Sequence, residues 1–181
     1  AYKGVINSNN ENIYLKGPKK SGKSYLANIW KKKNNAIVFK NNFNFIIHNK
    51  INVIIENLNK EFNEEQLFHI INHCKLNNLN IFVTSIYDVR EINFKLKDLI
   101  SRLKIFNFLI IDNPDDDMLI NLLTKLFIEK QFVINSHEIF QFILKNANRS
   151  YSEMFKIVKK LDDLSIEKKR QLTIPLIKEI L

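Results

Sequence analysis

Residues 17–24 have the types and the spacing of a loop that binds phosphate groups. They read Gly-Pro-Lys-Lys-Ser-Gly-Lys-Ser, a complete G-x-x-x-x-G-K-[ST] pattern. In such a loop the backbone N–H groups surround the β-phosphate, and the N-terminus of the following helix adds a partial positive charge. We expect Lys23 to reach the β- and γ-phosphates and the Ser24 hydroxyl to bind Mg²⁺. The residues predicted to contact a nucleotide here are Gly17, Pro18, Lys19, Lys20, Ser21, Gly22, Lys23, Ser24 and Tyr25.

A phosphate loop works only where a strand leads into it and a helix leaves it. Residues 12–15 form a short apolar stretch that predicts the strand, and residues 25–30 place Leu26, Ile29 and Trp30 on one helical face. The chain has only three glycines, and two of them lie in the loop. The alternative, an accidental match in an ordinary strand-to-helix turn, is disfavoured by both flanks.

A second apolar run, residues 52–57, ends in Glu56 and Asn57. Continuous apolar residues are typical of a parallel strand buried on both faces, whose carboxyl end faces the phosphate loop. Glu56 therefore stands where an acidic residue would hold the Mg²⁺ shell; the alternative is a carboxylate that caps the following turn. Asn57 stands where many ATPases carry a glutamate that polarises the attacking water. Because an amide does not take up a proton, we expect slow hydrolysis.

Three more apolar stretches predict strands at residues 36–39, 81–85 and 105–111. The stretch at 81–85 ends in two hydroxyl residues, Thr84 and Ser85. In an ATPase of this architecture that end carries the sensor of the γ-phosphate, and we assign this role to Thr84. Residues 43–48 are ambiguous between helix and strand.

Between these strands the pattern predicts helices over residues 64–79 and 94–103. In the first of them Glu65, His69 and His73 recur every four residues, as metal ligands can. Ile70 follows His69, so the metalloprotease pattern H-E-x-x-H is missing, and we interpret these side chains as a solvated helix face.

The clearest boundary lies at residues 112–117, where a proline stops the last strand and aspartates favour the first turn of a helix. The remainder reads as helical over residues 118–130, 137–146, 154–164 and 174–181, with Ser136, Ser150 and Thr173 as predicted caps. We therefore predict an α/β fold. A phosphate-loop domain with a parallel sheet flanked by helices covers residues 1–112, and a small helical lid domain covers residues 113–181.

The composition sets further limits. With 181 residues and 45% hydrophobic content, the chain is long enough to bury a substantial core. No apolar run reaches the length of a membrane span, residues 1–4 carry no signal-peptide core, and a single cysteine, Cys74, fits a reducing compartment. The net charge of +9 invites a nucleic-acid role, but lysines scattered beside asparagines are weak evidence for a dedicated binding surface.

In this order, the phosphate loop, the acidic strand end, the sensor strand, a Ser-Arg motif and a helical lid resemble an AAA+ ATPase. More narrowly, the chain resembles the DnaA-related branch and, within it, the Hda-type regulators that inactivate the DnaA initiator. Residues 55–58, Ile-Glu-Asn-Leu, are similar to that family's Ile-Asp-Asn segment. Residues 96–103, Leu-Lys-Asp-Leu-Ile-Ser-Arg-Leu, resemble its Leu-Pro-Asp-Leu-x-Ser-Arg-Leu motif. The tail at residues 170–181 is the closest match, and the similarity covers essentially the whole chain.

The resemblance implies that Arg102 is an arginine finger acting on nucleotide bound by a neighbouring subunit; the plain alternative is a helix-surface arginine. It also implies bound ADP or ATP with Mg²⁺, a DnaA-like initiator as partner, and a bacterial cytoplasmic location. The family's sliding-clamp-binding peptide is not among these 181 residues, and the chain ends where DnaA continues into its DNA-binding domain. We therefore expect no sequence-specific DNA reading, and homo-oligomerisation is left open.

Departures from the family pattern predict weak intrinsic hydrolysis. The family's aspartate after the sensor pair is matched by Ile86, and the lid arginine called sensor 2 aligns with Ser152, although Arg149 lies close enough to replace it. With Asn57, these changes favour a nucleotide held as a structural or switch ligand. Two alternatives remain open: a DNA-dependent AAA+ ATPase or helicase-loader-like protein, and a degenerate phosphate-loop adaptor that acts only through protein contacts.

Overall fold

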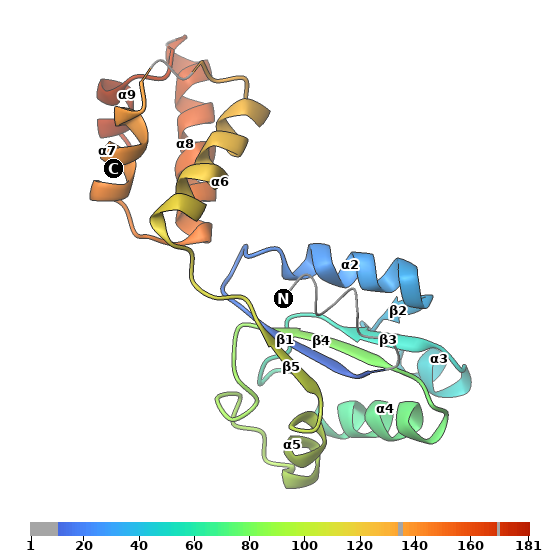
Figure 1. Ribbon diagram of the computed structural model, residues 1–181. Helices are drawn as coiled ribbons and strands as arrows, with labels where there is room; N and C mark the ends of the chain where they lie inside the picture. Colours follow the sequence, from blue (N-terminus) through green and yellow to red (C-terminus); the bar gives the residue numbers. More distant parts are fainter. Residues whose placement is uncertain (1–10, 134–135, 170) are drawn as a thin grey trace. The chain divides into compact units, whose positions relative to one another are not determined.

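The computed structural model describes residues 11–133, 136–169 and 171–181. Residues 1–4 and Arg170, the first residue of the family-like tail, lie outside the described residues. The chain divides into two compact units, Ala1–Asp112 and Asn113–Leu181 (Figure 1). Among the described residues, no helix is both long enough and apolar enough to cross a membrane.

Strands and helices alternate in the first unit. Its strands are β1 (Ile13–Lys16), β2 (Ala36–Val38), β3 (Asn52–Ile55), β4 (Ile81–Ser85) and β5 (Asn107–Ile110). Its helices are α2 (Lys23–Asn34), α3 (Phe43–His48), α4 (Glu64–Leu76) and α5 (Lys97–Leu103). The strands form a parallel sheet in the order β2-β3-β4-β1-β5, so β1 lies between β4 and β5. The predicted parallel α/β fold is confirmed.

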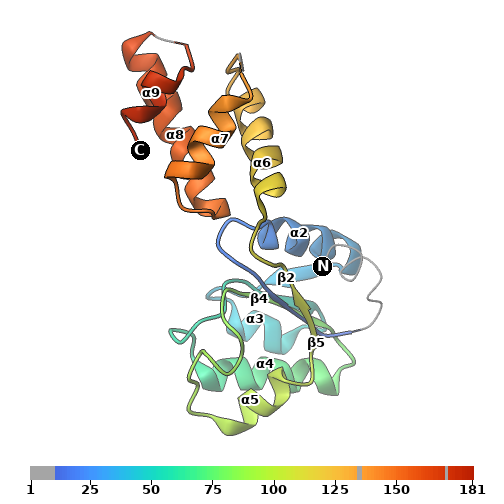
Figure 2. The ribbon, with the colours of Figure 1, turned by 60° about the vertical axis from the view of Figure 1, so that its left-hand side comes forward.

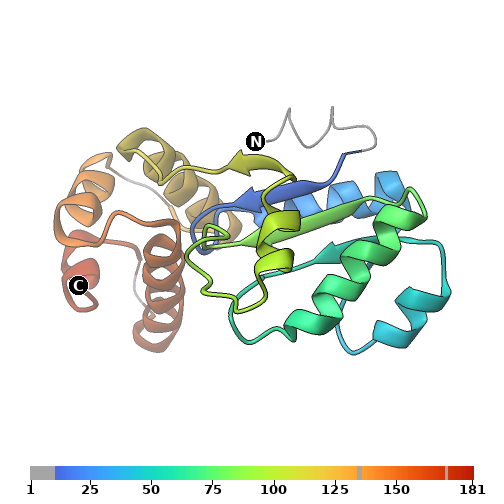
Figure 3. The same cartoon turned by 90° about the horizontal axis from the view of Figure 1, so that it is seen from below.

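Apolar strand residues alternate between the two faces of the sheet, and each face is covered by its own helices (Figures 1 and 3). On one face, Leu26 and Trp30 of α2 pack against Leu15 and Phe82. On the other face, α3, α4 and α5 cover a larger cluster, whose members include Tyr14, Ile46, Ile70, Val83 and Leu99. Burial on both faces is the reason that the strands read as continuous apolar runs.

Several boundaries differ from those expected from the sequence: α4 ends at Leu76 rather than at residue 79, β5 begins at Asn107 rather than at residue 105, and the helix expected over residues 154–164 is α8 (Tyr151–Lys168). The ambiguous segment at residues 43–48 is the helix α3, which buries Ile46. α5 begins at Lys97 rather than near residue 94, and the contact responsible is distant in sequence. The carboxylate of Glu64 on α4 accepts hydrogen bonds from the backbone N–H groups of Lys95 and Leu96, and Leu96 is extended.

The second unit contains α6 (Asp116–Glu129), α7 (Glu138–Asn146), α8 (Tyr151–Lys168) and α9 (Ile174–Lys178), which pack around one apolar cluster (Figure 2). Ser150 and Thr173 cap α8 and α9 through their hydroxyl oxygens, as predicted. Ser136 was expected to be the N-cap of α7, but the N-cap is the next residue, His137. The Ser136 hydroxyl still accepts a hydrogen bond from the N–H of Glu138.

The lid cluster can be tested with two large apolar residues of α6. Leu123 is fully buried, whereas Met118 is 51% exposed. Leu123→Ala removes buried methyl groups and leaves a cavity, so we expect the free energy of unfolding to fall by about 2–5 kcal/mol. Met118→Ala, the matched control, should change it by less than about 0.5 kcal/mol. Urea denaturation followed by circular dichroism measures both values, and equal losses would contradict this packing.

Candidate nucleotide-binding site

Residues 17–22 form the loop between the inner strand β1 and α2, at the carboxyl end of the sheet. Two residues of the loop have positive φ, Lys20 at 65° and Gly22 at 89°. Gly22 is the N-cap of α2 and takes this conformation without steric cost. At the other end of the loop, the N–H of Gly17 donates to the carbonyl of Ser85 at the end of β4 (3.1 Å). The loop is therefore fixed to the sheet on one side and to α2 on the other.

Gly17 is required for a different reason, which is space. A Cβ atom at this position would lie 2.9 Å from the Cβ of Ile111 and 3.0 Å from the Oγ of Ser21. The first distance is shorter than real side-chain contacts allow, and the backbone beside Ile111 leaves no room to retreat. Only glycine lets the phosphate loop pass this close to the end of the neighbouring strand.

Lys23 is the first residue of α2 and is only 6% exposed. Its ammonium donates hydrogen bonds to the backbone carbonyls of Gly17 (2.8 Å) and Pro18 (2.7 Å). Burial lowers the pKa of this ammonium below the ordinary lysine value. An ammonium has three N–H donors. Within the described part of the chain two of them have these acceptors, so the third is available to a phosphate oxygen.

A cavity of about 530 Å³, here called the phosphate cavity, opens over the loop. Its size lies in the range of small-molecule sites. It is lined by Lys19, Lys20, Ser21, Gly22, Lys23, Ser24, Tyr25, Asn57 and Ile86. The Oγ of Ser21 is buried without a hydrogen-bond partner among the described residues, and a ligand oxygen would supply one. The predicted loop residues thus gather around one cavity, except Gly17 and Pro18, whose carbonyls hold Lys23.

The groups of the phosphate cavity suit a phosphate chain with a magnesium ion. Lys19, Lys23 and the N-terminus of α2 supply positive charge, and the Ser24 hydroxyl in the first turn of α2 would bind Mg²⁺. Glu56, the other predicted ligand, is half-buried directly after β3 and is not among the residues that line the cavity. The described residues include no group of three or more His, Cys, Asp or Glu side chains that could hold a metal ion. A Mg²⁺ ion here would therefore depend on phosphate oxygens and water as further ligands.

The end of β4 joins the phosphate loop to the loop after β3. Thr84 and Ser85 are fully buried. The Oγ1 of Thr84 accepts a hydrogen bond from the N–H of Asn57 (2.9 Å), and the Ser85 hydroxyl donates to the carbonyl of Leu58 (2.7 Å). The Ser85 carbonyl also accepts the N–H of Gly17. Sequence reasoning missed Ser85, although a hydroxyl at the end of a buried strand was the available signal; sensing of the γ-phosphate by Thr84 stays a prediction.

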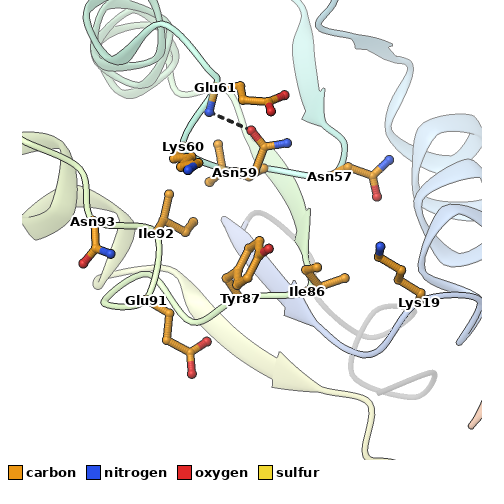
Figure 4. Close-up of a pocket in the computed structure, with 11 residues that line it drawn as sticks. Lys19, Asn57, Asn59, Lys60, Glu61, Ile86, Tyr87, Glu91, Ile92 and Asn93 are labelled. Carbon is orange, nitrogen blue, oxygen red and sulfur yellow. Dashed lines mark hydrogen bonds between the residues drawn. The ribbon is translucent and has the colours of Figure 1, made fainter.

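Asn57 borders both the phosphate cavity and a second cavity of about 510 Å³ (Figure 4). Its side chain is exposed, and its φ is positive at 56°. Figure 4 shows the second cavity between the loop of residues 57–61 and the loop of residues 86–93, with Lys19 at the side of the phosphate loop. Asn57, Lys19 and Ile86 line both cavities. The position predicted to face the attacking water is thus occupied by the amide of Asn57. The apolar residue Ile86 also lines both cavities.

The two predicted arginines lie in different units. Arg102 is half-buried in the last turn of α5, and its guanidinium carbon lies 5.1 Å from the centroid of the Phe68 ring. It is not among the residues that line the phosphate cavity. Arg149 lies before α8, and its Nε is 3.0 Å from the Oδ1 of Asp116 in an ion pair whose partners are both more than half exposed. Exposed pairs of this kind are weak, so Arg149 could exchange its partner for another anion, and its contact with nucleotide stays a prediction.

The remaining chemically active side chains of α4 have structural partners. The ring of His69 contacts the ring of Phe68, and the Nε2 of His73 lies 3.0 Å from the carbonyl oxygen of Asn49. Cys74 is buried, and burial raises the pKa of its thiol to about 12. A thiol with such a pKa is not a nucleophile at neutral pH.

Comparison with known proteins gives a family for the second unit and a fold for the chain. Residues 116–181 match the family model described as "Hda, lid domain". No curated protein sequence matches the chain.

Among solved structures, the chain is similar to the replication initiator DnaA bound to AMPPCP and single-stranded DNA, with a TM-score of 0.68 and 17% identity over 92% of this chain and 62% of that one. It is also similar to AMPPCP-bound DnaA from Aquifex aeolicus, with a TM-score of 0.69 and 16% identity over 90% and 59%. For the T158V variant of RuvB from Thermotoga maritima the TM-score is 0.72, with 15% identity over 98% and 63%. The chain spans about three fifths of the length of these proteins.

A parallel sheet of this strand order, a phosphate loop after the inner strand β1 and a helical lid region give the chain the fold of AAA+ P-loop proteins. The lid match assigns residues 116–181 to the Hda lid domain family, and the similarity to the DnaA structures gives the fold of the chain. Both findings agree with the DnaA-related, Hda-type resemblance inferred from the motifs.

The first prediction for this site concerns Lys23. Lys23→Ala removes the buried ammonium, so we expect ATP and ADP to bind about 10- to 100-fold more weakly through the loss of charge-assisted hydrogen bonds. The matched control is Lys32→Ala, which removes an exposed ammonium at the other end of α2 and should leave the affinity unchanged. Titration with a fluorescent nucleotide analogue measures the three dissociation constants. Equal affinities for wild type and Lys23→Ala would exclude this lysine as a phosphate ligand.

A second prediction concerns pH. Because burial lowers the pKa of Lys23 and only its protonated form attracts phosphate, nucleotide affinity should fall at a less alkaline pH than for an ordinary lysine. The effect on folding has the opposite sign. The folded chain binds this proton less tightly than the unfolded chain, so the associated loss of stability is largest below the folded pKa and disappears as the pH rises above the unfolded value.

Calorimetric titration of nucleotide from neutral to alkaline pH measures this dependence, with Lys23→Ala as the reference. Wild type should lose affinity over a pH range in which the alanine variant changes less. Parallel curves for the two proteins would show that Lys23 does not titrate in the binding reaction.

Proposed function

We propose that this protein is a nucleotide-binding regulator of DNA replication initiation that stimulates ATP hydrolysis by a DnaA-type initiator through Arg102. The observation that supports it best is the Hda-type lid at residues 116–181, joined in one chain to an intact phosphate loop. Regulators of this type act on the nucleotide of a partner, and the proposal assigns Arg102 to that task.

The protein's own nucleotide, ADP or ATP with Mg²⁺, is proposed to be a structural or switch ligand. Among the described residues, the third donor of the Lys23 ammonium and the hydroxyl of Ser21 have no acceptor or partner, which supports phosphate binding. Two of the similar DnaA structures contain AMPPCP, a nucleotide analogue, which supports the same assignment. Asn57 and Ile86 at the edge of the phosphate cavity bring no carboxylate to the attacking water, which supports slow turnover.

The location of Arg102 supports action on a second molecule. It belongs to α5, on the face of the sheet opposite to α2, and it does not line the phosphate cavity among the described residues. An arginine finger in trans stabilises the charge that develops on a neighbour's γ-phosphate. A location away from the protein's own phosphates is what such a role requires.

A second candidate is a DNA-dependent AAA+ ATPase or helicase-loader-like protein. The observations in its favour are the fold similarity to RuvB and to a DnaA structure that contains single-stranded DNA. It requires appreciable intrinsic turnover despite Asn57. Steady-state ATPase assays of the protein alone, with and without single-stranded DNA, distinguish the two candidates: turnover accelerated by DNA would favour the motor, and firmly held ADP without turnover the regulator.

The decisive prediction concerns Arg102. Wild-type protein, added with clamp-loaded DNA to ATP-bound DnaA, should accelerate ATP hydrolysis, and Arg102→Ala should lower that acceleration by about 10³-fold, the usual contribution of an arginine finger. Its own affinity for ADP should not change, because Arg102 does not line the phosphate cavity. Lys104→Ala, which removes a neighbouring exposed cation, is the matched control. No acceleration by the wild-type protein would sink the proposal.

A further inference from the structure

Arg102 is held in place by an aromatic ring. The guanidinium carbon lies 5.1 Å from the ring centroid of Phe68, a half-buried residue of α4. Within the described residues, the Arg102 side chain has no ion pair with a carboxylate and no side-chain hydrogen bond. This distinguishes it from Arg149, which is paired with Asp116.

The difference matters for what the arginine can bind. A carboxylate partner would neutralise the guanidinium and occupy its N–H donors, which are the groups that recognise phosphate. A ring restrains the flat guanidinium from one face and uses none of the five donors at its edge. Arg102 is therefore ordered and still fully charged toward an incoming anion.

An acidic residue one helical turn before Phe68 on α4 already has other partners. Glu64 lies one helical turn before Phe68, and its carboxylate accepts the backbone N–H groups of Lys95 (3.1 Å) and Leu96 (2.7 Å). Leu96 is the N-cap of α5 and has no cap from its own side chain. Glu64 thus fixes the start of α5, and its charge is directed to the backbone rather than to Arg102.

α4 therefore holds α5 at both ends. Glu64 binds the start of α5, Phe68 lies against Arg102 in its last turn, and the two helices lie side by side on the same face of the sheet (Figure 1). Leu99 and Leu103 of α5 are buried in the same apolar cluster as the inner face of α4. The backbone of Arg102 is therefore anchored through packed neighbours, and the Phe68 ring lies against its side chain.

We propose that Phe68 is a positioning residue that holds Arg102 as an uncompensated anion-binding group, so that the pair forms the surface which receives the phosphate chain of a nucleotide bound by the partner. This inference rests on the proposed function in naming that anion. The restraint of Arg102 by Phe68 is independent of the partner and can be measured on the protein alone.

The functional test compares Phe68→Leu, which keeps an apolar side chain but removes the ring face, with Phe68→Tyr, which keeps the ring. Phe68→Leu should lower the maximal stimulated rate of DnaA ATP hydrolysis by about 3- to 10-fold, the range expected for loss of a partly buried cation–π contact. The protein concentration that gives half-maximal stimulation should change less. Phe68→Tyr should restore the wild-type rate.

Two further variants separate positioning from general damage. In an Arg102→Ala background, Phe68→Leu should have no additional effect on the stimulated rate, because the ring then has nothing to position. Phe142→Leu removes the ring that faces Lys178 in the second unit and is the matched control for a lost ring beside a cation. It should leave the stimulated rate unchanged.

The measurement that needs no partner is the ¹⁵N–¹H resonance of Arg102 Nε in the isolated protein. The Phe68 ring should shift this resonance, so it should move in Phe68→Leu and stay near its wild-type position in Phe68→Tyr. An unmoved resonance in Phe68→Leu, or wild-type stimulation by that variant, would overturn the inference. If the wild-type protein fails to stimulate DnaA while the resonance behaves as expected, the proposed function fails and the positioning of Arg102 by Phe68 stands.

Discussion

The phosphate site depends on the hydrogen bonds at the end of β4. Within two residues, Thr84 and Ser85 bind the N–H of Asn57, the carbonyl of Leu58 and the N–H of Gly17. All three contacts are made by buried groups whose loss would leave donors or acceptors unpaired. The phosphate loop and the loop after β3 are therefore held in a fixed relation by the buried end of β4, whose residues Thr84 and Ser85 do not line the phosphate cavity. The two loops of the site are positioned by their hydrogen bonds to the end of β4, without any ligand.

α4 links the loop after β3 to α5, the helix that carries Arg102. It starts seven residues after Asn57, with Asn63 as its cap, and its first turns provide both Glu64 and Phe68. The same helix buries Leu67, Ile70 and Ile71 against the sheet, so its position is set by the core rather than by the surface. One helix, α4, thus supports both Arg102 and the loop after β3 that borders the phosphate cavity, although these lie at different parts of the first unit.

What the sequence could predict was local. The phosphate loop follows from eight consecutive residues, and the buried strands follow from continuous apolar runs, so both were recognised without knowledge of the fold. What it could not predict depends on contacts between distant residues. The start of α5 is set by Glu64, more than thirty positions away, and the Phe68 ring beside Arg102 is as distant. The role of Ser85 is equally invisible, because it depends on register: Leu15 lies opposite Thr84, which brings β1 and its loop to the same level.

The close approach of Gly17 to Ile111 has a mechanical consequence. Ile111 is the next-to-last residue of the first unit, and its N–H donates to the carbonyl of Lys16 (2.8 Å) directly before the phosphate loop. The chain therefore leaves the sheet at the loop that would hold the nucleotide, and it does so from a clamped end. The residues that lead out of the first unit are thus anchored by the same strand ends that position the phosphate loop.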